Sequence, residues 1–317
     1  MGAKVSIIFF GTHTFAATIL QGLIDSGLFD IRLVITQPDR PVGRKQEMQK
    51  SPVKLLAEKH SLQLDQPTTL RSYVLSPMSN GVVHKTYDVG ICAQYGLIIP
   101  ESILNTPKHG TINVHTSLLP NYRGASPIQT ALMNGETQTG VTIMKMDAGL
   151  DTGPIILQKM LDIAPDDTYT TIDEKMAKIA ILGLLEAIPQ YISGALQPVP
   201  QDNSKATTTK QLTREDGRVD WQKTAQEIYN QCRGLTPWPG VWTEFDPSTS
   251  LRASKRVKLI KIKPIDKNIK HGTWNMEQDG LFVGCKTGAI EIEELQVEGK
   301  KKQSAKEFVN GYKNKLK

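Results

Sequence analysis

This chain of 317 residues has few cysteines and begins with only a short apolar stretch, and each of these features excludes some classes of protein. It has three cysteines, Cys92, Cys232 and Cys285, which lie far apart and lack C-x-x-C spacing, so the sequence argues against a zinc ribbon or a disulfide framework. We expect them to be buried small apolar residues. The apolar stretch at residues 5–10 is too short for a signal peptide or a membrane span. We therefore predict a cytoplasmic protein without a membrane partner.

Nucleotide-binding and metal-binding motifs are also missing. The turn at residues 11–16 carries His13 where a dinucleotide-binding fingerprint needs its central glycine, which excludes NAD binding there. No G-x-x-x-x-G-K-[ST] loop supports nucleotide hydrolysis. The six histidines are scattered without ligand spacing, so we expect no metal.

Charge of one sign is scarce in the first two thirds of the chain. Residues 1–206 carry 17 basic and 18 acidic side chains, whereas residues 207–317 carry 21 and 14. The formal net charge of +6 therefore arises entirely from the C-terminal part. Such a part suits a polyanionic partner, although a solvated basic face explains the composition equally well.

The first part of the chain alternates buried strands with amphipathic helices. Predicted strands cover residues 5–10, 31–36, 88–94, 111–115 and 140–146, and predicted helices cover 15–28, 52–60, 69–78 and 126–134. This alternation is typical of a Rossmann-like α/β domain with a parallel sheet. Ligands of such sheets bind beyond the carboxyl ends of the strands. We therefore expect the segments after residues 94, 115 and 146 to meet in one cleft.

The rest of the chain predicts a second domain. A helix over residues 170–193, kinked or ended by Pro189, should close a first domain of residues 1–193. Residues 194–212 are rich in Pro, Gln, Ser and Thr, as linkers are. A helix at 225–234 and strands at 241–245, 257–263, 280–285 and 289–295 then predict a small β-barrel of the oligonucleotide-binding (OB) kind in residues 213–317.

Three polar side chains could form an acyl-transfer site. His115 can accept a proton near neutrality, and a carboxylate such as Asp151 would orient the ring and stabilise its protonated form. Asn113, two residues before His115 on an extended chain, points to the same face, where its amide can donate to a developing oxyanion. No protein nucleophile is required if the substrate supplies an amine.

Each of these residues also has a plainer interpretation. Asn113 could cap a turn, His115 could be a core histidine with satisfied hydrogen bonds, and Asp151 could close an Asx-turn. Ser117 could be a hydrolase nucleophile, but no Gly-x-Ser-x-Gly motif surrounds it. The combination of amide, imidazole and carboxylate beside Gly and Pro turns favours the catalytic interpretation.

The surrounding motifs resemble those of the folate-dependent formyltransferases. The shared runs are Asn-Val-His at 113–115, Ser-Leu-Leu-Pro at 117–120, Tyr-Arg-Gly-Ala-Ser-Pro-Ile-Gln at 122–129, Thr-Gly-Val-Thr-Ile at 139–143 and Asp-Ala-Gly-Leu-Asp-Thr-Gly at 147–153. Stretches at 36–41, 218–221 and 237–239 are similar to the members that act on methionyl-tRNA. The resemblance covers nearly the whole chain.

The resemblance implies a reaction and the residues for it. The donor would be 10-formyltetrahydrofolate, and the acceptor would be the α-amine of methionine on initiator methionyl-tRNA. Asn113, His115 and Asp151 match the family's catalytic set. The folate pocket would be formed by Tyr95, Gly96, Leu97, Ser117, Leu118, Leu119, Pro120 and Asp147.

The same resemblance implies tRNA contacts in both parts of the chain. The polar loop at residues 38–51 matches the loop with which the family grips the acceptor stem, and a solvated surface loop is the alternative. Basic side chains of the C-terminal barrel would bind tRNA phosphates. The expected contacts are Arg40, Arg44, Lys45, Lys50, Lys255, Arg256 and Lys258. We expect a monomer, because no feature indicates an obligate interface.

Three positions, His13, Gln94 and Thr116, depart from the usual family pattern. None is a catalytic group, but Gln94 and Thr116 border the expected pocket, so the affinity for folate is less determined than the reaction class. Two other functions stay open: a relative that formylates a small amine, and a non-catalytic tRNA-binding protein on the same scaffold. The basic C-terminal part argues against the first, and the complete catalytic set argues against the second.

Overall fold

The computed structural model describes residues 4–43, 46–71, 86–245, 255–277 and 280–312. Its contacts divide the chain into two compact units. The first comprises Met1–Gly124, Gln138–Asp162 and Asp173–Thr208, and the second comprises Ala125–Thr137, Ile163–Ile172 and Thr209–Lys317. Two short segments from the middle of the chain thus belong to the unit that contains the C-terminal part.

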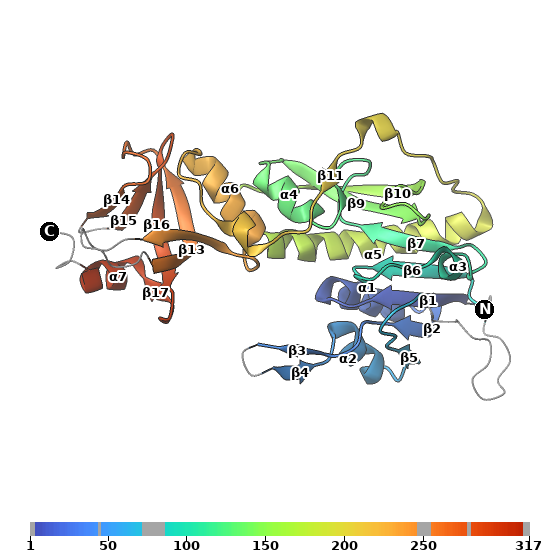
Figure 1. Ribbon diagram of the computed structural model, residues 1–317. Coiled ribbons are helices and arrows are strands. Elements are labelled where there is room, and N and C mark those ends of the chain that lie inside the picture. Colours follow the sequence, from blue (N-terminus) through green and yellow to red (C-terminus); the bar gives the residue numbers. More distant parts are fainter. Residues whose placement is uncertain (1–3, 44–45, 72–85, 246–254, 278–279, 313–317) are drawn as a thin grey trace. The chain divides into compact units, whose positions relative to one another are not determined.

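A seven-stranded sheet forms the centre of the first unit (Figure 1). Its strands, in spatial order, are β10 (Ile155–Asp162), β9 (Gln138–Lys145), β7 (Thr111–His115), β6 (Val89–Ala93), β1 (Val5–Gly11), β2 (Phe29–Ile35) and β5 (Leu64–Asp65). Strands β7, β6, β1, β2 and β5 run parallel. The predicted Rossmann-like α/β class is therefore confirmed.

The direction of β9 corrects the sequence prediction. This strand runs antiparallel to β7 and pairs Thr142 with His115 and Lys145 with Ile112. Its carboxyl end therefore lies beside the start of β7, away from the edge where β6 and β7 end. Strand β10, which the sequence did not predict, pairs antiparallel with β9. The pattern of β9 could not reveal its direction, because central strands buried on both faces read as continuous apolar runs.

Helices cover both faces of this sheet. Helices α1 (Thr14–Asp25), α2 (Pro52–Lys59) and α5 (Tyr169–Ser193) lie together, and a Cβ atom added at Gly22 of α1 would lie 2.6 Å from Ile181 of α5. Helix α2 begins where Ser51 accepts the backbone N–H of Lys54, with Pro52 in its first turn. On the other face, helix α3 (Glu101–Leu104), which the sequence did not predict, packs against the even-numbered side chains of β1.

Helix α5 spans 25 residues. It confirms the helix predicted over residues 170–193, and Pro189 does not end it, because the helix continues to Ser193. This helix is long and apolar enough to cross a membrane, but the core helix of a soluble protein can have the same length and composition. Met176, Leu184 and Ile188 are fully buried, so these apolar side chains are used in the packing of the protein itself.

An antiparallel sheet forms the second unit, as the sequence predicted. Its strands, in spatial order, are β12 (Val241–Phe245), β13 (Lys255–Ile265), β16 (Ala289–Val297), β15 (Gly280–Gly284) and β14 (Trp274–Glu277), with β17 (Gln303–Ser304) beside β16. Helices α6 (Ala225–Leu235) and α7 (Ala305–Tyr312) contribute to its core. No strand pair among the described residues joins β12 to β14, so closure into an OB-type barrel stays a prediction.

The remaining predicted helices have different outcomes. The prediction at 126–134 is confirmed by α4 (Pro127–Met133), which packs against α6 in the second unit. The prediction at 225–234 is confirmed by α6 itself, which begins with a capping box between Thr224 and Glu227. The helix predicted at 69–78 lies largely outside the described residues.

Candidate active site

Asn113 and His115 lie two residues apart on β7 and point to the same face of the sheet. Cys92 of β6 pairs with Asn113 and belongs to the core cluster on the α3 side. Val114 points to the opposite face, where its partner Ile143 lies against α5. The two polar side chains are therefore on the face of the sheet opposite α5.

The loop after β9 brings Asp151 to these two side chains. Asp151 Oδ2 lies 3.7 Å from His115 Nδ1, and the Asn113 amide donates to Asp151 Oδ1 at 3.5 Å. Oδ2 also accepts the backbone N–H of Gly124 at 2.8 Å. The three side chains meet although β9 is antiparallel to β7, because the loop folds back over β7 before β10 begins.

The two ring nitrogens of His115 have different surroundings. Nε2 lies 3.0 Å from the backbone oxygen of Tyr122. A carbonyl oxygen can only accept, so Nε2 must carry a hydrogen, and Nδ1 is the atom left to take up a proton. The side chain of His115 keeps 7% of its surface exposed and that of Asp151 keeps 12%, so the pair is largely shielded from water but not closed off.

The backbone of the Asp151 loop is strained. Asp151 has a φ of 53°, in the left-handed region that costs a residue with a Cβ atom about 1 kcal/mol or more. Nearby, a Cβ atom at Gly153 would lie 1.8 Å from the carbonyl oxygen of Lys145. The glycine is therefore needed for the chain to fold back, and other contacts must hold Asp151 in its conformation.

Those contacts come from residues 194–212, the segment predicted to be a linker. Gln201 Nε2 donates to the backbone oxygens of Asp151 and Gly153 at 2.9 and 2.7 Å. Arg123 in turn donates to Gln201 Oε1 from Nε at 3.1 Å and from Nη2 at 2.7 Å. Sequence reasoning missed both side chains: Arg123 lies in a family motif, but nothing in the composition of the segment distinguishes Gln201.

Four of the predicted folate-binding residues, Ser117, Leu118, Leu119 and Pro120, follow β7 directly. Ser117 is buried and donates its hydroxyl to the carbonyl of Asn121 at 2.7 Å. The backbone N–H of Leu119 donates to Thr142 Oγ1 at 3.1 Å, and Gln158 donates to the carbonyl of Leu119 at 2.8 Å. Strands β9 and β10 thus fix the backbone of this turn at the edge where β7 ends.

The other predicted folate-binding residues lie on two separate loops. The Tyr95 side chain is 2% exposed and packs edge-on against Phe10, and this burial raises its pKa to about 12. A ligand would therefore meet the backbone of Tyr95 and Gly96 and the half-buried Leu97. Asp147 is exposed and lies near the start of β7, because β9 is antiparallel. The carboxyl end of β9 is therefore not at the edge of the sheet where β6 and β7 end. The strand order alone does not bring Asp147 to the predicted folate-binding residues at that edge.

The predicted acceptor-stem loop contains a hairpin of β3 (Arg40–Val42) and β4 (Glu47–Gln49). Arg40 is exposed on it. The ammonium of Lys50 lies 2.8 Å from Glu58, whose hydrogen bond raises the pKa of Lys50, so this charge is balanced locally. Arg44 and Lys45 lie outside the described residues.

The predicted tRNA contacts of the second unit lie on β13. Lys255 and Arg256 are exposed and Lys258 is half-buried. The Arg256 guanidinium carbon lies 4.1 Å from the ring centroid of Trp242, and that of Arg218 lies 5.6 Å from it. Because Trp242 pairs with Lys258 in the sheet, Arg256, Lys258 and Trp242 share one face. The sequence had not singled out Arg218 or Trp242 as individual contacts.

A different arrangement surrounds two further lysines of β13. Glu293 lies 2.7 Å from Lys261 and 2.5 Å from Lys263, so both ammonium groups form ion pairs with one carboxylate, which offsets one of their two charges. For Lys255, Arg256 and Lys258, no ion pair occurs within the described part of the chain. The free positive charge of this strand is therefore concentrated in its first four residues.

The three cysteines are free and buried, as the sequence predicted. Burial raises the pKa of Cys92 to about 12 and that of Cys285 to about 11. Among the described residues, no group of three or more His, Cys, Asp or Glu side chains is placed to hold a metal ion.

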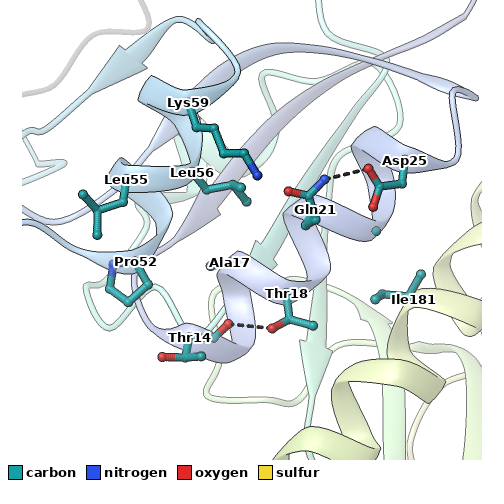
Figure 2. Close-up of a pocket in the computed structure, with 11 residues that line it drawn as sticks. Thr14, Ala17, Thr18, Gln21, Asp25, Pro52, Leu55, Leu56, Lys59 and Ile181 are labelled. Carbon is teal, nitrogen blue, oxygen red and sulfur yellow. Dashed lines mark hydrogen bonds between the residues drawn. The ribbon is translucent and has the colours of Figure 1, made fainter.

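A hollow of about 610 Å³ on the first unit lies away from the candidate site (Figure 2). It is lined by α1, α2 and Ile181 of α5, with Gln21, Leu55 and Lys59 among its residues. It lies on the α5 side of the sheet, whereas Asn113 and His115 are on the other side. The hollow and the candidate site are therefore on opposite faces of the sheet.

Comparison with known proteins identifies the family. Residues 3–188 match the formyl transferase family, and residues 211–313 match the formyl transferase C-terminal domain. The chain is 41% identical over 315 residues to the methionyl-tRNA formyltransferase of Caldicellulosiruptor saccharolyticus, which covers 98% of this chain and 97% of the relative. The chain belongs to the methionyl-tRNA formyltransferases. The resemblance seen in the motifs is thereby confirmed.

Solved structures of formyltransferases share the fold. A methionyl-tRNA formyltransferase from Clostridium thermocellum gives a TM-score of 0.55 at 18% identity, over 91% of this chain and 98% of that chain. A sugar 3N-formyl transferase, crystallised in the presence of dTDP and 5-N-formyl-THF, gives a TM-score of 0.66 at 20% identity, over 95% and 100%. At these identities the likeness concerns the fold alone.

Proposed function

We propose that the protein transfers a formyl group from 10-formyltetrahydrofolate to the α-amine of initiator methionyl-tRNA, with Asn113, His115 and Asp151 as its catalytic residues. The observation that carries the proposal is that the Asn113 amide and the His115 imidazole, on one face of β7, lie 3.5 Å and 3.7 Å from the Asp151 carboxylate. Membership of the methionyl-tRNA formyltransferases supports the reaction class and both substrates. The proposed enzyme is a cytoplasmic monomer.

His115 Nδ1 is the proposed proton acceptor. When the substrate amine attacks the formyl carbon, a new C–N bond forms and the amine nitrogen must lose a proton. Nδ1 can take it, because the Tyr122 carbonyl keeps the hydrogen of the neutral ring on Nε2. The imidazolium then faces the Asp151 carboxylate in surroundings with little water, where opposite charges stabilise one another more than in bulk solvent.

The same proton completes the reaction. Breaking the bond between the formyl carbon and N10 of the folate leaves that nitrogen in need of a proton, which the imidazolium returns. Tetrahydrofolate and the formylated amine are then the only products, and His115 is again neutral. No metal, water or redox partner is needed for this balance.

Asn113 is the proposed donor to the oxyanion. Attack on the formyl group places negative charge on its oxygen, and an oriented donor at that position typically contributes about 100-fold to 1000-fold in turnover. The Asn113 amide has two N–H groups, and the one contact to Asp151 uses only one of them. The contact to Asp151 also fixes the direction in which the second N–H points.

The tRNA is proposed to be held mainly through its phosphates. Arg256 stacks on Trp242 and is exposed, which limits its rotamers and leaves its outer N–H groups for a phosphate. Lys258 lies on the same face, and Lys255 precedes both on the strand. In the first unit, the proposed contact on the described part of the hairpin is Arg40.

The test is an assay with three acceptors. Purified protein and 10-formyltetrahydrofolate are incubated with charged initiator tRNA, charged elongator methionyl-tRNA or a small amine, and formylated product is measured. We expect transfer to the initiator tRNA at a rate well above the other two. Transfer only to the small amine would support a relative with another substrate, and binding of tRNA without transfer to any acceptor would refute the enzyme assignment.

A further inference from the structure

Gln201 uses both ends of its side-chain amide. Its nitrogen donates to two carbonyls of the Asp151 loop, at 2.9 and 2.7 Å. Its oxygen accepts two N–H groups of Arg123, at 3.1 and 2.7 Å. Only an amide can meet these partners at once, because a carboxylate has no donor for the carbonyls and an apolar side chain has neither group.

Arg123 determines which way this amide points. The guanidinium is a donor only, so the oxygen of Gln201 must face it and the nitrogen must face the loop. Arg123 is 7% exposed and donates also to Asn203 Oδ1 at 2.8 Å. Its strand β8 (Arg123–Gly124) pairs with β11 (Thr208–Thr209), so the whole arrangement is built into the segment that leads towards the C-terminal part.

The position of the Asp151 carboxylate depends on this arrangement. The backbone of Asp151 is in the left-handed region, which it would leave if nothing opposed the strain. Gln201 donates hydrogen bonds to the carbonyls of Asp151 and Gly153, on either side of Thr152. The backbone N–H of Gly124, one residue after Arg123, donates to the Asp151 carboxylate itself. The side chain of Asp151 is thus held by the backbone of β8, and the backbone of Asp151 is held by Gln201 in the segment between α5 and β11.

We propose that Gln201, oriented by Arg123, is a positioning residue that keeps the Asp151 carboxylate beside His115. This inference rests on the proposed catalytic role of Asp151 and extends it to residues 200–209. A displacement of well under 1 Å matters at such a site, because catalysis depends on the orientation of the reacting groups. The segment is therefore part of the active site as well as a connection.

The test compares three variants by steady-state kinetics. Gln201→Leu removes both amide functions, and Gln201→Glu keeps an acceptor for Arg123 but turns an oxygen towards two carbonyls. Gln197→Leu is the matched control, because Gln197 is exposed in the same segment and donates only to Gly194 within the described contacts, at 2.7 Å. We expect kcat to fall about 10-fold or more in both Gln201 variants, with KM for tRNA within about 2-fold and Gln197→Leu unchanged.

A double mutant separates positioning from a general structural role. In an Asp151→Asn background, Gln201→Leu should have little further effect on kcat, because its effect acts through that carboxylate. Equal losses in both backgrounds would overturn the inference.

The outcomes also distinguish this inference from the proposed function. Loss of turnover in Asp151→Asn with normal turnover in Gln201→Leu would contradict this inference but not the proposed function. Normal turnover in Asp151→Asn would contradict the proposed catalytic role of Asp151, on which the inference rests. If Gln201→Leu does not fold, as judged by thermal melting, Gln201→Asn replaces it: it keeps the amide but shortens its reach by one methylene, and the same kinetic result is expected.

Discussion

Asp151 faces the ring nitrogen of His115 that the Tyr122 carbonyl does not hold. The separation between Oδ2 and Nδ1 is 3.7 Å, which is longer than a hydrogen bond. A neutral ring with its hydrogen on Nε2 presents a lone pair to the carboxylate, so the two groups attract one another fully only after Nδ1 takes up a proton. The carboxylate therefore lies beside the ring nitrogen that would carry the transferred proton in the proposed reaction.

The first prediction concerns this pair. Asp151→Asn should lower kcat by about 100-fold or more while leaving KM for tRNA within about 2-fold, because the imidazolium loses its counter-charge but the tRNA surface is untouched. Steady-state formylation with initiator methionyl-tRNA measures both constants. Asp162→Asn, at the exposed end of β10, is the control. A kcat that survives within a few-fold would contradict the proton-transfer assignment.

The second prediction concerns the salt dependence of tRNA binding. Replacing Arg256 and Lys258 by Gln should make the slope of log affinity against log salt concentration shallower by about 1 to 2, because a surface that neutralises fewer phosphates releases fewer counterions. Replacing Lys261 and Lys263 by Gln is the matched control on the same strand, where both ammonium groups already form ion pairs with Glu293. Fluorescence titrations at several salt concentrations give the slopes. Equal changes in the two double variants would place the tRNA surface elsewhere.

The third prediction concerns the cysteines. At pH 8 the folded protein should react only slowly with a thiol reagent, because all three thiols are buried and burial raises the pKa of Cys92 to about 12. In denaturant all three should react at the rate of a free thiol. Mass spectrometry after timed alkylation counts the modified residues. Rapid modification of Cys92 in the folded protein would show that the sheet beneath Asn113 is open to solvent.

The fourth prediction concerns acid stability. Asp88 accepts the backbone N–H and the hydroxyl of Ser6, both at 2.8 Å, and the backbone hydrogen bond is the largest cause that lowers the pKa of Asp88. A lowered pKa in the folded state stabilises the protein above the ordinary aspartate range, and this contribution disappears as pH falls through the folded value. Asp88→Asn should therefore cost on the order of 1 kcal/mol at pH 7 and progressively less towards pH 3.

Chemical denaturation at several pH values measures that difference. Asp25→Asn provides the control, because Asp25 is exposed at the end of α1 and contacts only a side chain of the same helix within the described residues. A destabilisation by Asp88→Asn that is the same at pH 7 and pH 3 would show that the charge of Asp88 does not contribute.

Much of the fold could be predicted, because the apolar pattern of the sequence matches the burial of the same side chains in the structure. The runs that became β1 and β6 are buried on both faces, and α1 buries its apolar side chains on one stripe. The short strands β3 and β14 were missed, because three or four residues are too few to show a period. Helix α7 was missed although its buried Ala305 and Phe308 have helical spacing.

The sequence also indicated the side chains that meet at the candidate site, although for different reasons. Asn113 and His115 are two residues apart on a strand, so their common face follows from the period of two. Asp151 was associated with them through its motif, not through topology. The topological expectation for this region was wrong about the direction of β9, and the contact arises instead from a strained loop that returns over β7.

The amino-acid sequence by itself determined which chemical groups are available, that several long apolar runs are strands or helices, and that the excess positive charge lies after residue 206. Only the tertiary structure decided which nitrogen of His115 is free, which lysines form ion pairs with Glu293, and that Gln201 holds the loop of Asp151. The physical reason is that a hydrogen bond between residues 50 positions apart has no periodicity and no characteristic composition. It depends on where the folded backbone places a donor and an acceptor.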